Sequence, residues 1–180
     1  MARVKLIEKD GADTTLKEIY RRSEDQGRPV LNLVKLLANC PRMASDYLRY
    51  GGSVLRGENV PMKLRELATL RVGAIAGADY EFLHHTPLGV SAGLTRQQID
   101  EIADWPGSSL FDETERLVLG FTDQVAGDNR VTDETFAAMR AVFSEHDVVE
   151  LTMVIAYFVM LCRILVTFQL ELEPGFSPDA

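Results

Sequence analysis

Residues 66–94 read ELATLRVGAIAGADYEFLHHTPLGVSAGL, and this stretch carries the strongest prediction of the fold. An apolar stripe at helical spacing runs from Leu64 to Ile75 and breaks at Gly77. From Tyr80 to Val90 a second helical pattern carries acidic and histidine side chains. The stretch therefore predicts two consecutive helices joined by a turn, and Pro87 predicts a kink or a looser turn in the second helix.

Capping signals and apolar periodicity predict further helices on both sides of this stretch. Each predicted start has a proline, or a residue that can cap a helix, followed by apolar positions three and four apart. We find no alternation typical of strands over a convincing length, so the predicted fold class is all-α. The predicted starts are Thr14 or Thr15, Val30, Pro41, Pro61, Thr95, Asp112 and Thr132.

The most apolar segment, Val148–Leu170, has the length of a membrane span, but Glu150, Arg163 and Gln169 interrupt it. A charged side chain at the centre of a span costs roughly 2.5–3.5 kcal/mol on insertion scales. We therefore expect a helix in the protein core or at a subunit contact, and no membrane partner.

Length and composition indicate one domain over residues 1–180, with residues 1–10 and 174–180 expected to fray. The formal net charge of -8 argues against a nucleic-acid partner, because such a protein must replace counterions with its own Lys and Arg. The first residues lack the long apolar core of an export signal, which predicts a cytoplasmic location.

Glu81 and His85 are four residues apart, so they share one face of the predicted helix. A carboxylate can fix the tautomer of a neighbouring imidazole and raise its basicity, which makes the two a candidate proton-transfer pair. The same spacing also occurs in solvated pairs that contribute only about 0.2–0.5 kcal/mol to a helix. Spacing alone leaves both interpretations open.

The whole motif resembles the carboxymuconolactone decarboxylase / alkylhydroperoxidase D-like family. The shared features are Glu66 near the start of one helix, the Tyr-Glu-Phe-x-x-His element at 80–85, and the Ala-Gly-Leu ending at 92–94. The motif core covers residues 61–104. The resemblance implies an alkylhydroperoxidase D-like helical bundle, a homo-oligomer such as a trimer or hexamer, and side-by-side helices that bring Glu66 to the Glu81–His85 pair.

The sequence departs from the peroxidase branch of this family, which uses a Cys-x-x-Cys pair. Ala78 and Glu81 stand at those two positions. Cys40 and Cys162 lie outside the motif, and their apolar contexts predict two buried thiols. Disulfide-cycling peroxidase chemistry is therefore disfavoured, and the resemblance points to the branch of cofactor-free decarboxylases and related lyases.

The resemblance and the residue types assign roles to a small set of side chains. His85 is the expected general acid/base, Glu81 its orienting partner or the base itself, and Glu66 a relay or second proton acceptor. Arginines such as Arg65, Arg71 and Arg163 could hold a small anion, and Arg163 could instead neutralise a carboxylate in the packing of the last helix. The expected substrate contacts are Tyr80, His84 and Arg71. His84 points about 100° away from His85, so it could face solvent or a subunit contact instead.

The function predicted from the sequence is that of a cofactor-free lyase acting on a small carbonyl or lactone acid. One alternative is weak antioxidant activity through Cys40 or Cys162, and another is an oligomeric protein that binds a small molecule without turnover. Glu66, Glu81 and His85 could also ligate a divalent cation, but no Cys/His cluster supports this idea, and we expect no metal and no other cofactor.

Overall fold

The computed structural model describes residues 2–128 and 130–178, and these residues form helices and no strands. The all-α prediction is therefore confirmed. The α-helices are α1 (Thr14–Asp25), α2 (Asn32–Leu37), α3 (Pro41–Arg56), α4 (Met62–Ala76), α5 (Asp79–Ser91), α6 (Arg96–Asp100), α7 (Glu113–Asp123), α8 (Asp133–Val142) and α9 (Glu145–Phe168). Single 3₁₀ turns lie at Lys9–Gly11 (η1) and Trp105–Gly107 (η2), and a π-helical turn, η3 (Gln124–Asp128), follows α7.

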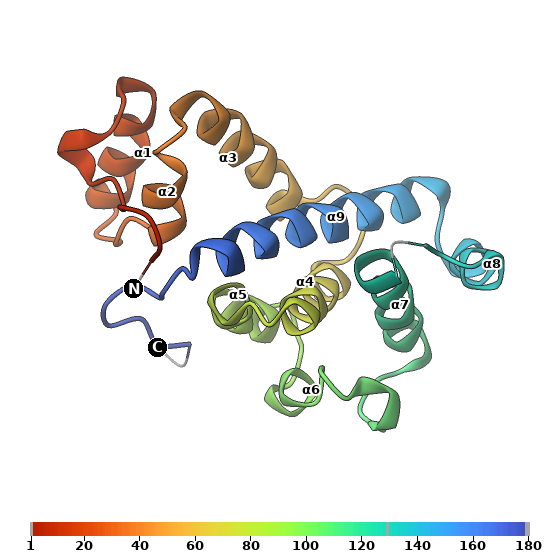
Figure 1. The fold of residues 1–180 in the computed structure, drawn as a ribbon. Coiled ribbons are helices and arrows are strands. Elements are labelled where there is room, and N and C mark those ends of the chain that lie inside the picture. The colour runs from red at the N-terminus through yellow and green to blue at the C-terminus, as the bar shows by residue number, and fades with distance from the viewer. Residues whose placement is uncertain (1, 129, 179–180) are drawn as a thin grey trace.

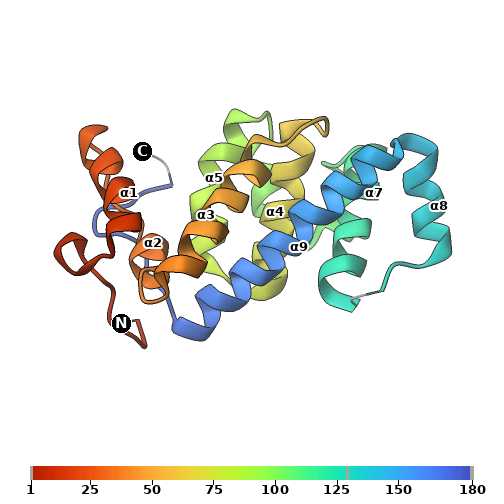
Figure 2. The same cartoon turned by 90° about the horizontal axis from the view of Figure 1, so that it is seen from above.

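The helices are arranged around α9, which crosses the whole molecule (Figure 1). The central helix α4 packs against α9, α5 and α7. Helices α1 to α3 lie toward one end of α9, and α7 and α8 lie toward the other (Figures 1 and 2). The core between α4 and α9 is built from large apolar side chains with no exposed surface, such as Leu67, Leu70 and Ile155.

Local signals place most helix ends as predicted. Helix α3 begins at Pro41, and capping boxes at Thr95 and Asp112 start α6 and α7. The cap of α1 is Asp13, whose side chain accepts the N–H of Thr15, so the predicted cap at Thr14 or Thr15 is wrong. A single polar acceptor one residue earlier was enough to move the helix start.

The turn between α4 and α5 follows the prediction closely. Gly77 caps α4 in the left-handed region, with φ 59°, where a side chain would be strained. Helix α5 then runs from Asp79 to Ser91 and contains Pro87 without a break in its α-helical residues, so the looser turn is not observed, and the alternative of a kink stays a prediction.

Helix α9 starts at Glu145, three residues before the predicted Val148, because Ser144 and Asp147 form a capping box. It ends at Phe168, and Gln169 takes a left-handed conformation. By length and composition α9 could cross a membrane, and 44% of its most apolar window is buried in this fold. Its inward side chains, such as Ile155 and Leu161, belong to the core, as predicted.

Segments near both chain ends contact the body of the protein, and the fraying expected at residues 1–10 and 174–180 stays a prediction. The N–H of Arg3 donates to the carbonyl oxygen of Phe168 at 2.9 Å, and that of Ile7 donates to Lys35 at 3.0 Å. At the other end, the ring of Phe176 lies 4.2 Å from that of His84. Residues 1 and 179–180 lie outside the described part of the chain.

Candidate functional site

Helices α4 and α5 pack side by side and enclose His85 between two carboxylates. Nδ1 of His85 lies 2.7 Å from Oε2 of Glu66, and Nε2 lies 3.0 Å from Oε1 of Glu81. His85 is 6% exposed and each glutamate 4% exposed. The packing that the resemblance implied is therefore present, and it produces a buried Glu66–His85–Glu81 triad.

Aromatic side chains from α9 and α3 close over this triad. Phe158 contacts His85 edge to face at 4.9 Å, and Tyr157 lies between Phe158 and Tyr47. Tyr157 reaches this place because residue 51 is glycine: a Cβ there would lie 2.2 Å from its hydroxyl oxygen. Gly51 thus lets α3 approach the aromatic cover of the triad.

The two carboxylates determine the charge of His85. Burial alone would lower its pKa, but hydrogen bonds and charge interactions with Glu66 and Glu81 outweigh burial and raise the pKa to about 9. At neutral pH the site is therefore an imidazolium between two carboxylates. Such a group can give a proton to a substrate, while a carboxylate beside it can accept one.

Tyr80 and His84, predicted as substrate contacts, instead hold the segment after α9. The Tyr80 hydroxyl donates to Oε1 of Glu173 at 2.6 Å, and Nε2 of His84 lies 2.8 Å from Oε2. The N–H of Asn32 donates to Oε1 as well, at 2.6 Å. Although burial raises the pKa of Glu173, these contacts outweigh it and lower the pKa to about 2.

Glu173 was not anticipated from the sequence. It lies in a non-helical segment next to Pro174, with no spacing that links it to α5. The ring of His84 stacks between Tyr80, at 4.5 Å, and Phe176. Tyr80 and His84 thus have partners within the protein, and their role as substrate contacts stays a prediction.

The three arginines considered for an anion differ in what they bind. Arg71 donates to Asp123 at 2.6 Å and to two backbone carbonyl oxygens. Arg65 is 8% exposed and donates to four carbonyl oxygens between Val54 and Val60. Arg163 is exposed and forms no ion pair with the residues that the structure describes, so the expectation that it neutralises a buried carboxylate is wrong.

The two cysteines lie in different environments. Cys162 is fully buried as predicted, but Cys40 is exposed at the start of α3, so the prediction of two buried thiols is wrong for Cys40. Burial and the Glu81 carboxylate raise the pKa of Cys162 to about 12, which keeps its thiol protonated at neutral pH. The turn before α5 has Ala78 in place of a thiol.

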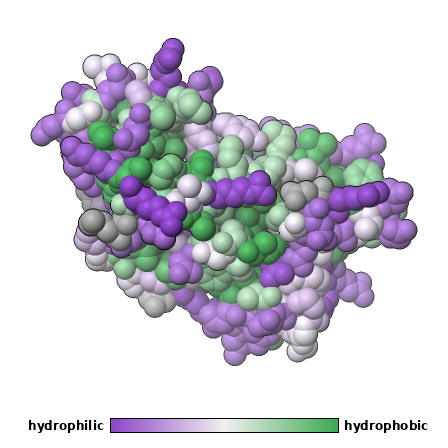
Figure 3. Space-filling view, in the orientation of Figure 1, coloured by the Kyte–Doolittle hydropathy of each residue, from purple (hydrophilic) through white to green (hydrophobic). Residues whose placement is uncertain are grey.

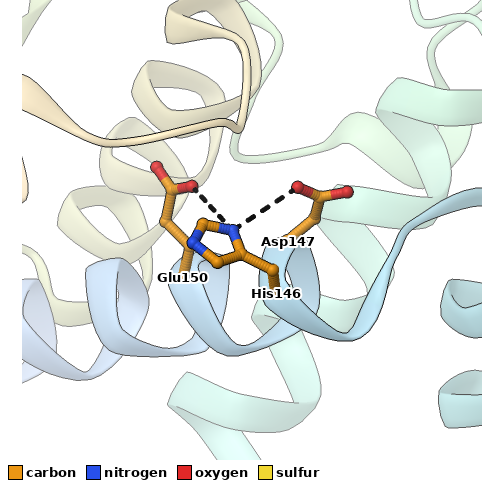
Figure 4. A group of neighbouring side chains, drawn as sticks. All are labelled: His146, Asp147 and Glu150. Atoms are coloured by element: carbon orange, nitrogen blue, oxygen red, sulfur yellow. Dashed lines mark ion pairs between the residues drawn. The ribbon is translucent and has the colours of Figure 1, made fainter.

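The donor atoms of the triad are poorly arranged for a metal, because both imidazole nitrogens face carboxylate oxygens. Among the described residues a different group, His146, Asp147 and Glu150, has the spacing of metal ligands (Figure 4). Nδ1 of His146 lies 3.9 Å from both acids. These acids already accept hydrogen bonds: Glu150 from three N–H groups at residues 58–60, and Asp147 from Ser144 and Asn59. The group caps α9 and anchors the loop before α4.

Fold and site together define an all-helical protein of the alkylhydroperoxidase D-like class, with an acid–histidine cluster in place of a thiol pair. The sequence profile of the carboxymuconolactone decarboxylase family matches residues 41–124, which include all of the triad. Over this segment the chain is similar to the carboxymuconolactone decarboxylase family, and its fold is that of alkylhydroperoxidase D-like proteins.

Solved structures share the fold at low sequence identity. A peroxidase-related protein with an AhpD core from Ralstonia eutropha JMP134 aligns over 96% of this chain and 92% of its own, with a TM-score of 0.83 and 18% identity. A proposed antioxidant defence protein AhpD from Agrobacterium tumefaciens aligns over 76% and 94%, with a TM-score of 0.71 and 24% identity.

A third similar structure is the debrominase Bmp8 in complex with 2,3,4-tribromopyrrole, with a TM-score of 0.79, 17% identity, and coverage of 96% of this chain and 94% of its own. At these identities the likeness establishes the fold. No curated protein sequence matches the chain significantly.

Proposed function

We propose that this protein is a cofactor-free lyase of the carboxymuconolactone decarboxylase type, which transfers a proton at an acidic carbon of a small carbonyl or lactone acid. The observation that carries the proposal is the buried His85 between Glu66 and Glu81, at 2.7 and 3.0 Å. Buried acid–base groups with a shifted pKa are typical of sites for proton transfer.

The charge state of the triad suggests which residue donates a proton and which accepts one. Since the pKa of His85 is raised to about 9, the imidazole is protonated at neutral pH and its first act is to donate. In a decarboxylation, the bond to the carboxylate breaks, its electron pair passes into an enolate as carbon dioxide leaves, and His85 then protonates the carbon. Glu66 holds the imidazole through Nδ1, and Glu81 serves as the base where a C–H proton must be removed.

The test is release of carbon dioxide and change of absorbance on a panel of small lactone and β-keto acids. We expect wild-type protein to turn over at least one acid and His85→Gln to lose about 10²–10⁴ of kcat. The matched control is His146→Gln. His146 also lies beside acidic side chains, but it is far more exposed than His85. Circular dichroism confirms that each variant is folded.

The outcomes separate the proposal from its alternatives. Equal loss in His85→Gln and His146→Gln would contradict a specific role for the triad. Binding of the acids without turnover would indicate a protein that binds small molecules. Peroxide turnover that disappears in Cys40→Ala would establish thiol chemistry, which the protonated Cys162 does not support.

We also propose that the chain forms a homo-oligomer, a trimer or hexamer. Apolar residues gather across the middle of one face of the molecule (Figure 3). On α9, Val149, Met153 and Met160 are 58%, 47% and 42% exposed. Apolar surface of this kind is typical of subunit contacts. Light scattering after size-exclusion chromatography tests this, and Met153→Glu should lower the measured mass.

A further inference from the structure

We propose that a groove between α4 and α9 binds the substrate's carboxylate through Arg163. The inference rests on the proposed function, because it assigns the substrate class of the same site. The groove has a volume of about 320 Å³, within the range of small-ligand sites. Its lining, all within the described residues, is Val72, Ile75, Ala76, Ala126, Val159, Cys162, Arg163, Val166 and Thr167.

Charge identifies the part of the ligand that Arg163 would bind. Arg163 is the one charged residue in this lining, and it forms no ion pair with any described residue. The donors of Arg65 and Arg71 are already taken by carbonyl oxygens and, for Arg71, by Asp123. A guanidinium group can bind a carboxylate through two parallel hydrogen bonds, and the apolar walls can contact the rest of the ligand.

The groove lies beside the triad. In its lining, Val159 is next to Phe158 on α9 and Cys162 lies one turn further on, and the ring of Phe158 contacts that of His85 at 4.9 Å. Another wall is Val72, six residues after Glu66 on α4 and so about 9 Å further along the helix axis. The groove therefore neighbours the residues that close over the triad.

The opposite wall is a π-helical turn. Ala126, in η3, lines the groove and is 9% exposed. Single π-turns are rare and occur often at functional sites, because the extra residue displaces the local side chains. The π-helical turn thus lies at the groove that contains Arg163.

Apolar walls with one cation favour a particular substrate. The remaining lining is aliphatic apart from Cys162 and Thr167. A monocarboxylate with an apolar body satisfies both parts of the groove, whereas a neutral analogue leaves Arg163 unused and a dianion leaves one charge in apolar surroundings. The substrate class is therefore a small, apolar monocarboxylic acid.

Ligand-observed NMR with two probes tests the site without requiring turnover. Phenylacetate has an apolar ring and one carboxylate, and 2-phenylethanol has nearly the same skeleton without the charge. We expect wild-type protein to bind phenylacetate more tightly than 2-phenylethanol. Arg163→Gln should weaken phenylacetate binding about tenfold and leave 2-phenylethanol binding unchanged, while Arg163→Lys, which keeps the charge but loses the two parallel hydrogen bonds, should fall between wild type and Arg163→Gln.

Arg42→Gln is the matched control, since Arg42 is exposed on α3 and its loss removes the same charge outside the groove. Equal weakening by Arg42→Gln and Arg163→Gln would overturn the site, as would equal binding of both probes by wild-type protein. Because Arg163 is exposed, its replacement is not expected to unfold the chain.

The kinetic arm separates this inference from the proposed function. If the acid panel is turned over, Arg163→Gln should raise KM about tenfold with little change in kcat. An unchanged KM would refute the site while the lyase proposal stands. Arg163-dependent binding of phenylacetate without turnover of any acid would refute the lyase proposal while the site stands.

Discussion

Two histidines of this protein lie among glutamates, and they differ in burial. His85 is 6% exposed between Glu66 and Glu81, whereas the side chain of His146 is 53% exposed beside Glu58 and Glu150. Both histidines have a glutamate four residues away on the same helix. The spacing is therefore the same in both places and glutamates raise the pKa of both histidines, but only His85 is enclosed between carboxylates in the core.

The difference shows what the carboxylates do in each place. Around His85 the acids come from two helices and direct oxygens at both ring nitrogens. Around His146, Glu150 instead accepts backbone N–H groups of the loop before α4, so its main work is structural. An exposed pair is also weakened by water and salt, while a buried one is not. Burial, more than spacing, separates the two clusters.

The largest expected effect comes from removing the buried cation. His85→Leu leaves Glu66 and Glu81 facing each other without a counter-charge, which should lower the free energy of unfolding by about 3–5 kcal/mol. Urea denaturation followed by circular dichroism measures this loss. His146→Leu is the control, and its unfolding midpoint should stay at the wild-type value. A similar drop in both variants would show that burial does not distinguish the clusters.

A second prediction concerns pH. The pKa of His85 rises from 6.5 to about 9 on folding, so the folded protein holds the proton more tightly than the unfolded chain. The resulting stabilisation is complete below about pH 6.5 and is lost as pH rises through about 9. A shift of this size corresponds to a loss on the order of 3 kcal/mol over that window.

Urea midpoints at pH 6.5 and pH 9 measure the loss, and His85→Gln should remove most of this dependence. His146→Gln should retain it. A wild-type midpoint that does not fall with pH over this window would mean that His85 is not held as an imidazolium.

The smallest effect is expected at a third His–Glu pair. His84 forms a pair with Glu173, which lies near the chain end. Glu173 also accepts hydrogen bonds from the Tyr80 hydroxyl and the Asn32 N–H. Glu173→Gln keeps the shape of the side chain but removes its charge, so we expect the free energy of unfolding to fall by about 1–2 kcal/mol. Since the pKa of Glu173 falls to about 2, this contribution is present above about pH 4.5 and is lost as pH falls toward 2.

Stability measured at pH 7 and pH 3 for wild type and Glu173→Gln checks this, because the difference between the two proteins should shrink at the lower pH. A gap that stays constant would assign the effect to shape instead of charge.

Much of the fold follows from local signals. Pro41, Thr95, Asp112 and Gly77 place helix ends because a proline, a polar cap or a left-handed residue acts on the backbone within one turn. The errors are also local in origin. Asp13 caps α1 in place of the threonines, and the Ser144 capping box starts α9 three residues early.

The candidate site was harder than the fold to predict from the sequence. Glu81 and His85 were found because residues four apart share a helix face, and Glu66 was added only through the family resemblance. Glu173 was missed, because its contacts with α5 join positions 89 and 93 residues apart. The exposure of Cys40 was missed for a similar reason, since apolar neighbours in sequence do not reveal what packs over a helix start.

The sequence alone was sufficient to predict the helical class, most helix ends and the residues that pair on one face of α5. These are short-range properties, governed by backbone geometry and by side chains within about one turn of each other. Tertiary packing brings Glu66 to His85, and it leaves Arg163 in a groove with no ion pair to any residue that the structure describes. Whether a charge lies in water or between packed helices depends on distant segments, and the pKa of His85 is raised because that packing brings Glu66 and Glu81 to its ring against the opposing effect of burial.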